Sequence, residues 1–185
     1  MSILSPEERR FLVHEARSAL ARHLGQGQDA QVAGVAPQVR AGAFVSLHCE
    51  GRLRGCIGTF DTTRPAVQQV REMAVAAGTR DPRFTPLSLQ ELPAVDIEIS
   101  VLTPPRAVES VEEIQIGRDG LVISRGYSRG VLLPQVAVEH DWDRTTFLQQ
   151  TCRKAGLPPH AWEQPGTVVE VFTAEVFGED SEEPC

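Results

Sequence analysis

Cys56 is the residue whose surroundings point most directly to chemistry. It lies in the run Leu53-Arg-Gly-Cys-Ile-Gly-Thr59, between Gly55 and Gly58 and two residues after Arg54. A guanidinium beside a thiol favours the thiolate, which is the nucleophilic form. Glycines inside a strand mark places where another backbone or a ligand comes close. The run predicts either a thiol site next to Arg54 or a buried structural cysteine, and the residue types leave both open.

A second charged segment, Thr79-Arg-Asp-Pro-Arg-Phe-Thr-Pro86, combines two arginines and one aspartate with two prolines. The prolines exclude a helix and stiffen the segment. Charged side chains on a stiff loop are typical of a recognition element, which would use Asp81 and Arg83. The alternative is a solvated loop with a local Asp81–Arg83 ion pair. The sequence leaves both explanations open.

Paired carboxylates and a histidine among acids also suggest chemistry, but each has a plainer explanation. Asp96 and Glu98 project from one face of a predicted strand, and such pairs usually form the solvent-facing side of an antiparallel sheet. His140 lies among acidic residues, in a stretch where Asp141 or Asp143 is needed to cap the next helix. We therefore expect Asp96 and Glu98 to lie on a solvent-facing (wet) sheet face, and Asp141 or Asp143 to cap a helix.

The sequence predicts neither a metal nor a cofactor site. Its four cysteines form no Cys-x-x-Cys pair, and their spacing matches no zinc finger. A site built from His48, Cys49 and Cys56 is weak, because His48 and Cys49 point to opposite faces of one predicted strand. No Walker loop and no His-Glu-x-x-His motif occurs.

Composition and charge narrow the class of protein. The 185 residues are 41% apolar and 23% charged, which is ordinary for a soluble globular chain. A net charge of −7 argues against nucleic-acid binding through bulk positive charge. No signal peptide is predicted, and no stretch approaches the roughly 18 apolar residues of a membrane helix. We expect a cytoplasmic protein with reduced thiols and no membrane association.

A β-hairpin is expected to carry the Cys56 run. Residues 43–50 alternate as a strand, and a tight turn at Glu50-Gly51 returns the chain as the partner strand. Alternation would put Arg54 and Cys56 on one face of that partner. A helix opens after it at Thr62-Thr-Arg-Pro65. If the helix begins near the end of the hairpin, its free N–H groups would favour a thiolate or a bound anion at Cys56.

The remaining pattern indicates an α+β fold with a mainly antiparallel sheet and flanking helices. The strands meet mostly as hairpins, and the regular strand–helix alternation of a doubly wound sheet is missing. Acidic residues after Phe177 predict a disordered tail over residues 178–185. Besides the hairpin, the predicted elements are helices at 5–24, 62–78 and 144–155 and strands at 94–103, 121–125, 131–133 and 168–177.

The run Leu53–Thr59 resembles the signature of the AMMECR domain family, also called AmmeMemoRadiSam system protein A. Further segments match family segments in the expected order, so that the resemblance covers roughly residues 5–177. These segments are Asp81–Phe84, Ile99–Leu102, Leu133–Val136 and Trp142–Leu157.

The resemblance implies a single domain over residues 1–177 with a larger and a smaller lobe, and it places residues 53–59 near their junction. It also implies partners, because prokaryotic members are associated with a Memo-like protein and a radical-SAM protein. No settled biochemical activity goes with the domain. The resemblance therefore indicates where the site lies and which partners to expect, but it does not indicate the reaction.

Two kinds of function follow. The first is an enzyme, or an enzyme component, in which Cys56 is the nucleophile or thiol carrier and arginines hold a small phosphate or carboxylate substrate. The second is a non-catalytic adaptor or regulatory module that docks partners through the same surface. A histidine base beside Cys56, His48 or His140, would favour the enzyme. The residues assigned to binding are Arg54, Gly55, Gly58, Thr59, Asp81 and Arg83, with Arg125 or Arg129 as further candidates.

Overall fold

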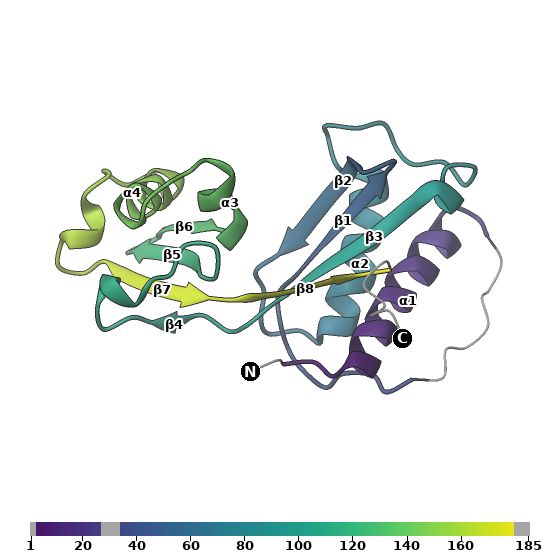
Figure 1. Cartoon of the computed structure of the whole chain (residues 1–185), viewed down its shortest axis with the longest axis horizontal. Helices are drawn as coiled ribbons and strands as arrows, with labels where there is room; N and C mark the ends of the chain where they lie inside the picture. Colours follow the sequence, from purple (N-terminus) through teal and green to yellow (C-terminus); the bar gives the residue numbers. More distant parts are fainter. Residues whose placement is uncertain (1–2, 27–33, 180–185) are drawn as a thin grey trace. The chain divides into compact units, whose positions relative to one another are not determined.

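The structure is a computed structural model that describes residues 3–26 and 34–179. Within those residues the chain forms four α-helices and two four-stranded sheets, which confirms the predicted α+β class (Figure 1). The chain divides into two compact units. Unit 1 comprises residues 1–102 and 175–185, and unit 2 comprises residues 103–174. No helix in the described ranges has the length and apolar character needed to cross a membrane.

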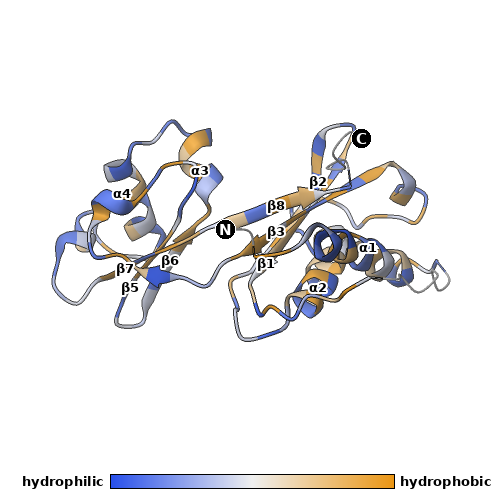
Figure 2. Cartoon of the chain, turned by 60° about the horizontal axis from the view of Figure 1, so that its bottom comes forward, coloured by the Kyte–Doolittle hydropathy of each residue, from blue (hydrophilic) through white to orange (hydrophobic). Residues whose placement is uncertain are grey.

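Unit 1 is a sheet with two helices on one face. The strand order is β2-β1-β3-β8, and the neighbouring pairs β1–β2 and β1–β3 are antiparallel. The helices α1 and α2 cover one face of this sheet and leave the other face without a helix (Figures 1 and 2). The bounds are α1 Pro6–His23, β1 Ala43–Cys49, β2 Arg52–Thr59, α2 Ala66–Thr79, β3 Val95–Leu102 and β8 Ala174–Gly178.

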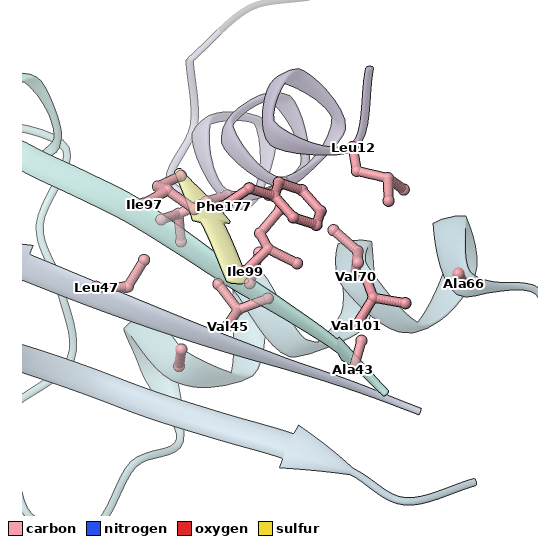
Figure 3. Close-up of a cluster of buried hydrophobic side chains, with 14 of the residues drawn as sticks. Leu12, Ala43, Val45, Leu47, Ala66, Val70, Ile97, Ile99, Val101 and Phe177 are labelled. Atoms are coloured by element: carbon pink, nitrogen blue, oxygen red, sulfur yellow. The ribbon is translucent and has the colours of Figure 1, made fainter. Parts of the chain in front are cut away.

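The core of unit 1 lies between the helices and the sheet. Alternate residues of β1 and β3 point to this side, and the polar residues between them point away. Figure 3 shows Leu12 of α1 and Val70 of α2 near the side chains that β1 and β3 contribute. Phe177 of β8 reaches the same cluster, so the C-terminal strand is anchored in unit 1.

Local signals set the first helix and the hairpin as predicted. The Ser5 hydroxyl accepts from the Glu8 N–H, and the Glu8 carboxylate accepts from the Ser5 N–H at 2.8 Å, so the capping box is formed. Glu50 and Gly51 turn the hairpin with left-handed φ angles of 51° and 73°. The pairing shifts register between Leu47 and His48, which makes a β-bulge in β2.

Unit 2 is a second sheet with the order β4-β7-β5-β6, and α4 packs on its β5 and β6 strands. Asp143 caps α4 by accepting from the Thr146 N–H at 2.7 Å, which confirms the predicted cap. Cys152 is buried in the core of this unit, and burial raises the pKa of its thiol. The bounds are β4 Arg106–Ala107, β5 Gly120–Arg125, β6 Ser128–Leu132, α3 Pro134–Glu139, α4 Arg144–Lys154 and β7 Val168–Phe172.

The prediction of one long strand over residues 168–177 is wrong. The segment splits at Thr173 into β7, which pairs with β5, and β8, which belongs to the sheet of unit 1. Thr173 N–H donates to Thr103 Oγ1 at 2.8 Å, and Thr103 N–H donates to the Thr173 carbonyl at 2.9 Å. No glycine or proline lies at Thr173 to mark the break in the sequence. The two strands are divided where Thr173 bonds to Thr103, which is a tertiary contact.

The prediction of a disordered tail is wrong for its first two residues, Gly178 and Glu179. Gly178 is the last residue of β8, and the Glu179 carboxylate accepts from Arg17 and from the Ile97 N–H. These bonds join residues far apart in sequence, so composition could not reveal them. Residues 180–185, which carry the rest of the predicted tail and Cys185, lie outside the described residues.

Candidate functional site

Cys56 lies on the helix-free face of the unit 1 sheet. On β2 it is directly opposite Ser46 of β1, whose neighbours Val45 and Leu47 point to the core. The Ser46 hydroxyl donates to Cys56 Sγ at 3.2 Å. Cys56 is partly exposed, so its thiol is neither sealed in the core nor free of contacts.

Asp81 fixes the backbone of Cys56. Its side chain is only 2% exposed, and its Oδ2 accepts the Cys56 N–H at 2.9 Å. Both carboxylate oxygens also accept from the Arg83 guanidinium, Oδ1 from Nε at 3.0 Å and Oδ2 from Nη2 at 2.7 Å. The Arg83 guanidinium and then the Cys56 amide hold the pKa of Asp81 well below its usual range, despite burial. The predicted Asp81–Arg83 pair exists, but its carboxylate is buried rather than solvated.

This contact closes a free sheet edge. β2 is an edge strand, so the N–H and C=O of Cys56 that point away from β1 have no strand to pair with. Asp81 takes the N–H, and Arg83 Nη2 lies 3.5 Å from the Cys56 carbonyl oxygen. The loop thus stands in for a neighbouring strand at the position of the thiol.

Arg83 is the guanidinium that faces solvent beside Cys56. Its side chain is 56% exposed, and it lies over the Phe84 ring at 5.4 Å. Asp81 raises the pKa of Arg83 further, so the group keeps its charge. Nε and Nη2 are occupied by Asp81, whereas Nη1 has no hydrogen-bond partner among residues 3–26 and 34–179. An anion at the thiol could therefore accept from Nη1.

Arg54 is placed differently from the prediction. It is the extra residue of the β2 bulge, which interrupts the alternation on which the shared face with Cys56 depended. Its guanidinium donates to Glu91 Oε1 from Nε at 3.1 Å and from Nη2 at 3.0 Å, and to the Thr85 carbonyl at 2.9 Å. With 16% exposure, Arg54 ties β2 to the 85–91 loop, and Glu91 offsets its charge.

The two glycines of the run are explained by packing. A Cβ on Gly55 would lie 2.1 Å from the Ala77 carbonyl oxygen in the last turn of α2. A Cβ on Gly58 would lie 2.1 Å from the ring of Phe44. Because the last turn of α2 lies against Gly55, the prediction that its N-terminus points toward Cys56 is wrong. The first N–H of α2, from Ala66, is bonded to the Val39 carbonyl instead.

Strand register adds residues that the sequence did not single out. Ser46 is opposite Cys56 on one side and opposite Glu98 of β3 on the other. His48 is likewise opposite Asp96. Asp96 and Glu98 are exposed, which confirms the wet sheet face. A thiol, a hydroxyl and a carboxylate thus form one row across three strands, and only the pairing register shows it.

Other candidates lie apart from the thiol or carry structural contacts. Within the described residues no hydrogen bond joins His48 to Cys56, whose bonded partner is Ser46. Thr59 is opposite Ala43, which is buried on the helix-covered side, and its hydroxyl accepts from the Asp61 N–H at 3.2 Å.

Two of the three candidates in unit 2, His140 and Arg125, have partners of their own. His140 stacks on Trp142 at 4.7 Å, and Arg125 donates to Gln164. Arg129 is exposed and lies opposite Ser124 of β5. In the part of the chain that the structure describes, no group of three or more histidine, cysteine, aspartate or glutamate residues could hold a metal ion.

Comparison with known sequences decides the family. The chain matches the AMMECR1 family over residues 13–177. It belongs to the AMMECR1 family. A protein of Methanothermobacter thermautotrophicus is 45% identical over 187 residues, covering 96% of this chain and 97% of that protein. Protein MJ0810 of Methanocaldococcus jannaschii is 40% identical, covering 97% of this chain and 94% of that protein.

A solved structure agrees with this AMMECR1 fold. The crystal structure of the uncharacterized protein PH0010 from Pyrococcus horikoshii matches with a TM-score of 0.80 at 39% identity. The match covers 97% of this chain and 95% of that chain. These matches confirm two predictions from the sequence, which are membership of the AMMECR family and the α+β fold class.

Proposed function

We propose that this AMMECR1-family chain is an enzyme component whose reacting group is the Cys56 thiol. The observation that carries the proposal is the placement of a partly exposed thiol on a helix-free sheet face, bonded to Ser46 and fixed through its own N–H by buried Asp81. A nucleophile must be accessible to its substrate and held in a defined position. The partial exposure of Cys56 makes the thiol accessible, and the bonds to Ser46 and Asp81 hold it in position.

Arg83 is the proposed binding group for the anionic part of a small substrate. A guanidinium with a free N–H edge is suited to phosphate or carboxylate oxygens. Each of Arg83 and Arg54 is paired with a carboxylate, but Arg83 is 56% exposed and keeps Nη1 unbonded among the described residues, whereas Arg54 is 16% exposed and donates from Nε, Nη1 and Nη2, so Arg83 fits this role better. The proposed substrate is therefore a small molecule with an acidic group near the atom that reacts with sulfur.

We further propose that the protein works in the cytoplasm with a Memo-like protein and a radical-SAM protein. The grouping rests on the family resemblance. The described cysteines Cys49, Cys56 and Cys152 are all free, which is consistent with a reducing compartment.

The second candidate, a non-catalytic adaptor, is favoured by the packing contacts of the same run. Gly55 gives room to α2, Gly58 gives room to Phe44, and Asp81 closes the edge of β2. Each of these contacts would be needed to build a docking surface with no chemistry at all. The reactivity of Cys56 separates the two candidates.

Alkylation of the native protein by neutral iodoacetamide tests the proposal. We expect Cys56 to be modified at a rate at least comparable with that of partly exposed Cys49, while buried Cys152 stays unmodified until the protein unfolds. Mass spectrometry of the cysteine peptides gives the three rates, and the protein unfolded in urea gives the reference rate for each.

The opposite result is equally clear. If Cys56 is modified only together with Cys152, the thiol is a packing group and the adaptor becomes the better account. A Cys56→Ser variant controls for peptide assignment, because it removes the Cys56 signal and leaves those of the other three cysteines.

A further inference from the structure

A shallow cleft of about 440 Å³ opens in unit 1 beside the end of β8. It lies between the β1–β2 turn, the start of β3 and the last residues of β8. Outward-facing side chains supply most of its polar surface. They are His48, Asp96, Glu98 and Glu179, and Val176 is the exposed apolar side chain among the lining residues.

Two carboxylates of the cleft lack partners. Asp96 and Glu98 are exposed, and neither has an ion pair or side-chain hydrogen bond within residues 3–26 and 34–179. Glu179 differs, because Arg17 and the Ile97 N–H hold it. Val176 beside them is 51% exposed, which is high for a valine on a strand. The cleft therefore offers negative charge next to an apolar surface.

The β5–β6 turn in unit 2 offers the complementary set. The ladder runs to the pair Arg125–Ser128, so that only Gly126 and Tyr127 form the turn, and Gly126 has a left-handed φ of 59°. Tyr127 is fully exposed. Arg129 is exposed and has no ion-pair partner among the described residues. Tyrosine and arginine are the residue types that most often dominate the energy of protein interfaces.

We propose that the β5–β6 turn of one copy of this chain docks into the cleft of a second copy. Arg129 would pair with the carboxylates of Asp96 and Glu98, and the Tyr127 ring would pack on Val176. Opposite charge and an exposed aromatic tip select a second copy over an acidic partner.

The contact has defined consequences. It joins different surfaces of two copies, so it closes into a reciprocal pair or a larger ring where the rotation allows and otherwise builds open chains. A two-residue turn in a shallow cleft covers little area, so we expect a dissociation constant on the order of 0.1–1 mM. Glu98 is opposite Ser46, and Ser46 is opposite Cys56 on its other side. The docked turn would therefore lie on the sheet face that carries the thiol. The association does not depend on whether Cys56 reacts.

Sedimentation velocity across roughly 20 µM to 1 mM tests the contact. We expect the wild-type chain to associate as concentration rises. Arg129→Glu and Glu98→Arg should each weaken the association about tenfold, and the double variant should restore it because the charges are exchanged. Arg22→Glu, the same charge change at an exposed site on α1, should leave it unchanged.

Three results would overturn the proposal. The first is a monomer at every concentration. The second is association that neither single variant weakens, and the third is failure of the double variant to restore it. If the chain stays monomeric while the amide NMR signals of Asp96 and Glu98 shift on adding agmatine, the cleft receives a small organic cation instead. Thermal unfolding of each variant checks that the exposed substitutions leave the fold intact.

Discussion

Replacing Gly55 with alanine is expected to destabilise the protein by about 3 kcal/mol or more. The added Cβ would lie 2.1 Å from the Ala77 carbonyl oxygen and 3.0 Å from its carbonyl carbon. Both are backbone atoms of α2, so relief requires moving the helix away from the sheet. That movement would open the core that Val70 and Ala74 form with β1. Urea unfolding followed by circular dichroism measures the effect.

Gly58→Ala is the matched control for Gly55→Ala. Its Cβ would also lie 2.1 Å from the nearest atom, but that atom belongs to the side chain of Phe44, which is not fully buried. A side chain can rotate where a helix backbone cannot, so we expect a loss of about 1 kcal/mol. Equal losses for the two variants would contradict the claim that Gly55 exists for the close approach of α2.

Replacing Asp81 with alanine is expected to cost about 3 kcal/mol of stability near neutral pH. The substitution removes the acceptor for the Cys56 N–H and leaves Arg83 without its carboxylate. Asp81→Asn keeps an acceptor of the same size but loses the charge, so we expect a smaller loss. Solvent screens the exposed side of Arg83, which limits the share that the ion pair contributes.

The Asp81 contribution should depend on pH in one direction. The pKa of Asp81 in the folded protein is far below the ~3.9 of an unfolded aspartate. The unfolded chain therefore takes up the proton first as pH falls, and the contribution is fully present above about pH 5. The stability difference between wild type and Asp81→Asn should be constant from about pH 5 to 7 and shrink below about pH 4. A difference that does not change with pH would show that the charge of Asp81 adds nothing.

The parts of the fold that local chemistry decides could be predicted from the sequence. The capping box at Ser5 acts within four residues, and the Glu50-Gly51 turn sets the hairpin. The break at Thr173 could not be predicted, because both halves keep the alternation of a strand. What divides them is a pair of bonds to Thr103, which lies 70 residues away in sequence.

The candidate site shows the same division. The sequence marks Cys56, Asp81 and Arg83 as residues of interest, but it does not show that Asp81 bonds the Cys56 amide across 25 positions. Nor does it show that Arg54 pairs with Glu91. The Asp81–Cys56 and Arg54–Glu91 contacts both depend on how the loop after α2 folds back on β2. Charge type can be taken from the sequence, whereas the pairing of charges is decided by tertiary contacts.

The most direct test of the central claim compares a charged and a neutral reagent at one thiol. For Cys56 we would measure the ratio of alkylation rates by iodoacetate and iodoacetamide, relative to the same ratio in the unfolded protein. Two opposite unit charges about 6 Å apart attract by roughly 0.7 kcal/mol in water, so we predict a ratio raised about threefold in the native protein. Arg83→Gln should abolish the increase, Arg83→Lys should keep most of it, and added salt should reduce it. An unchanged ratio, or an increase that survives Arg83→Gln, would contradict the proposal that Arg83 presents anions to Cys56.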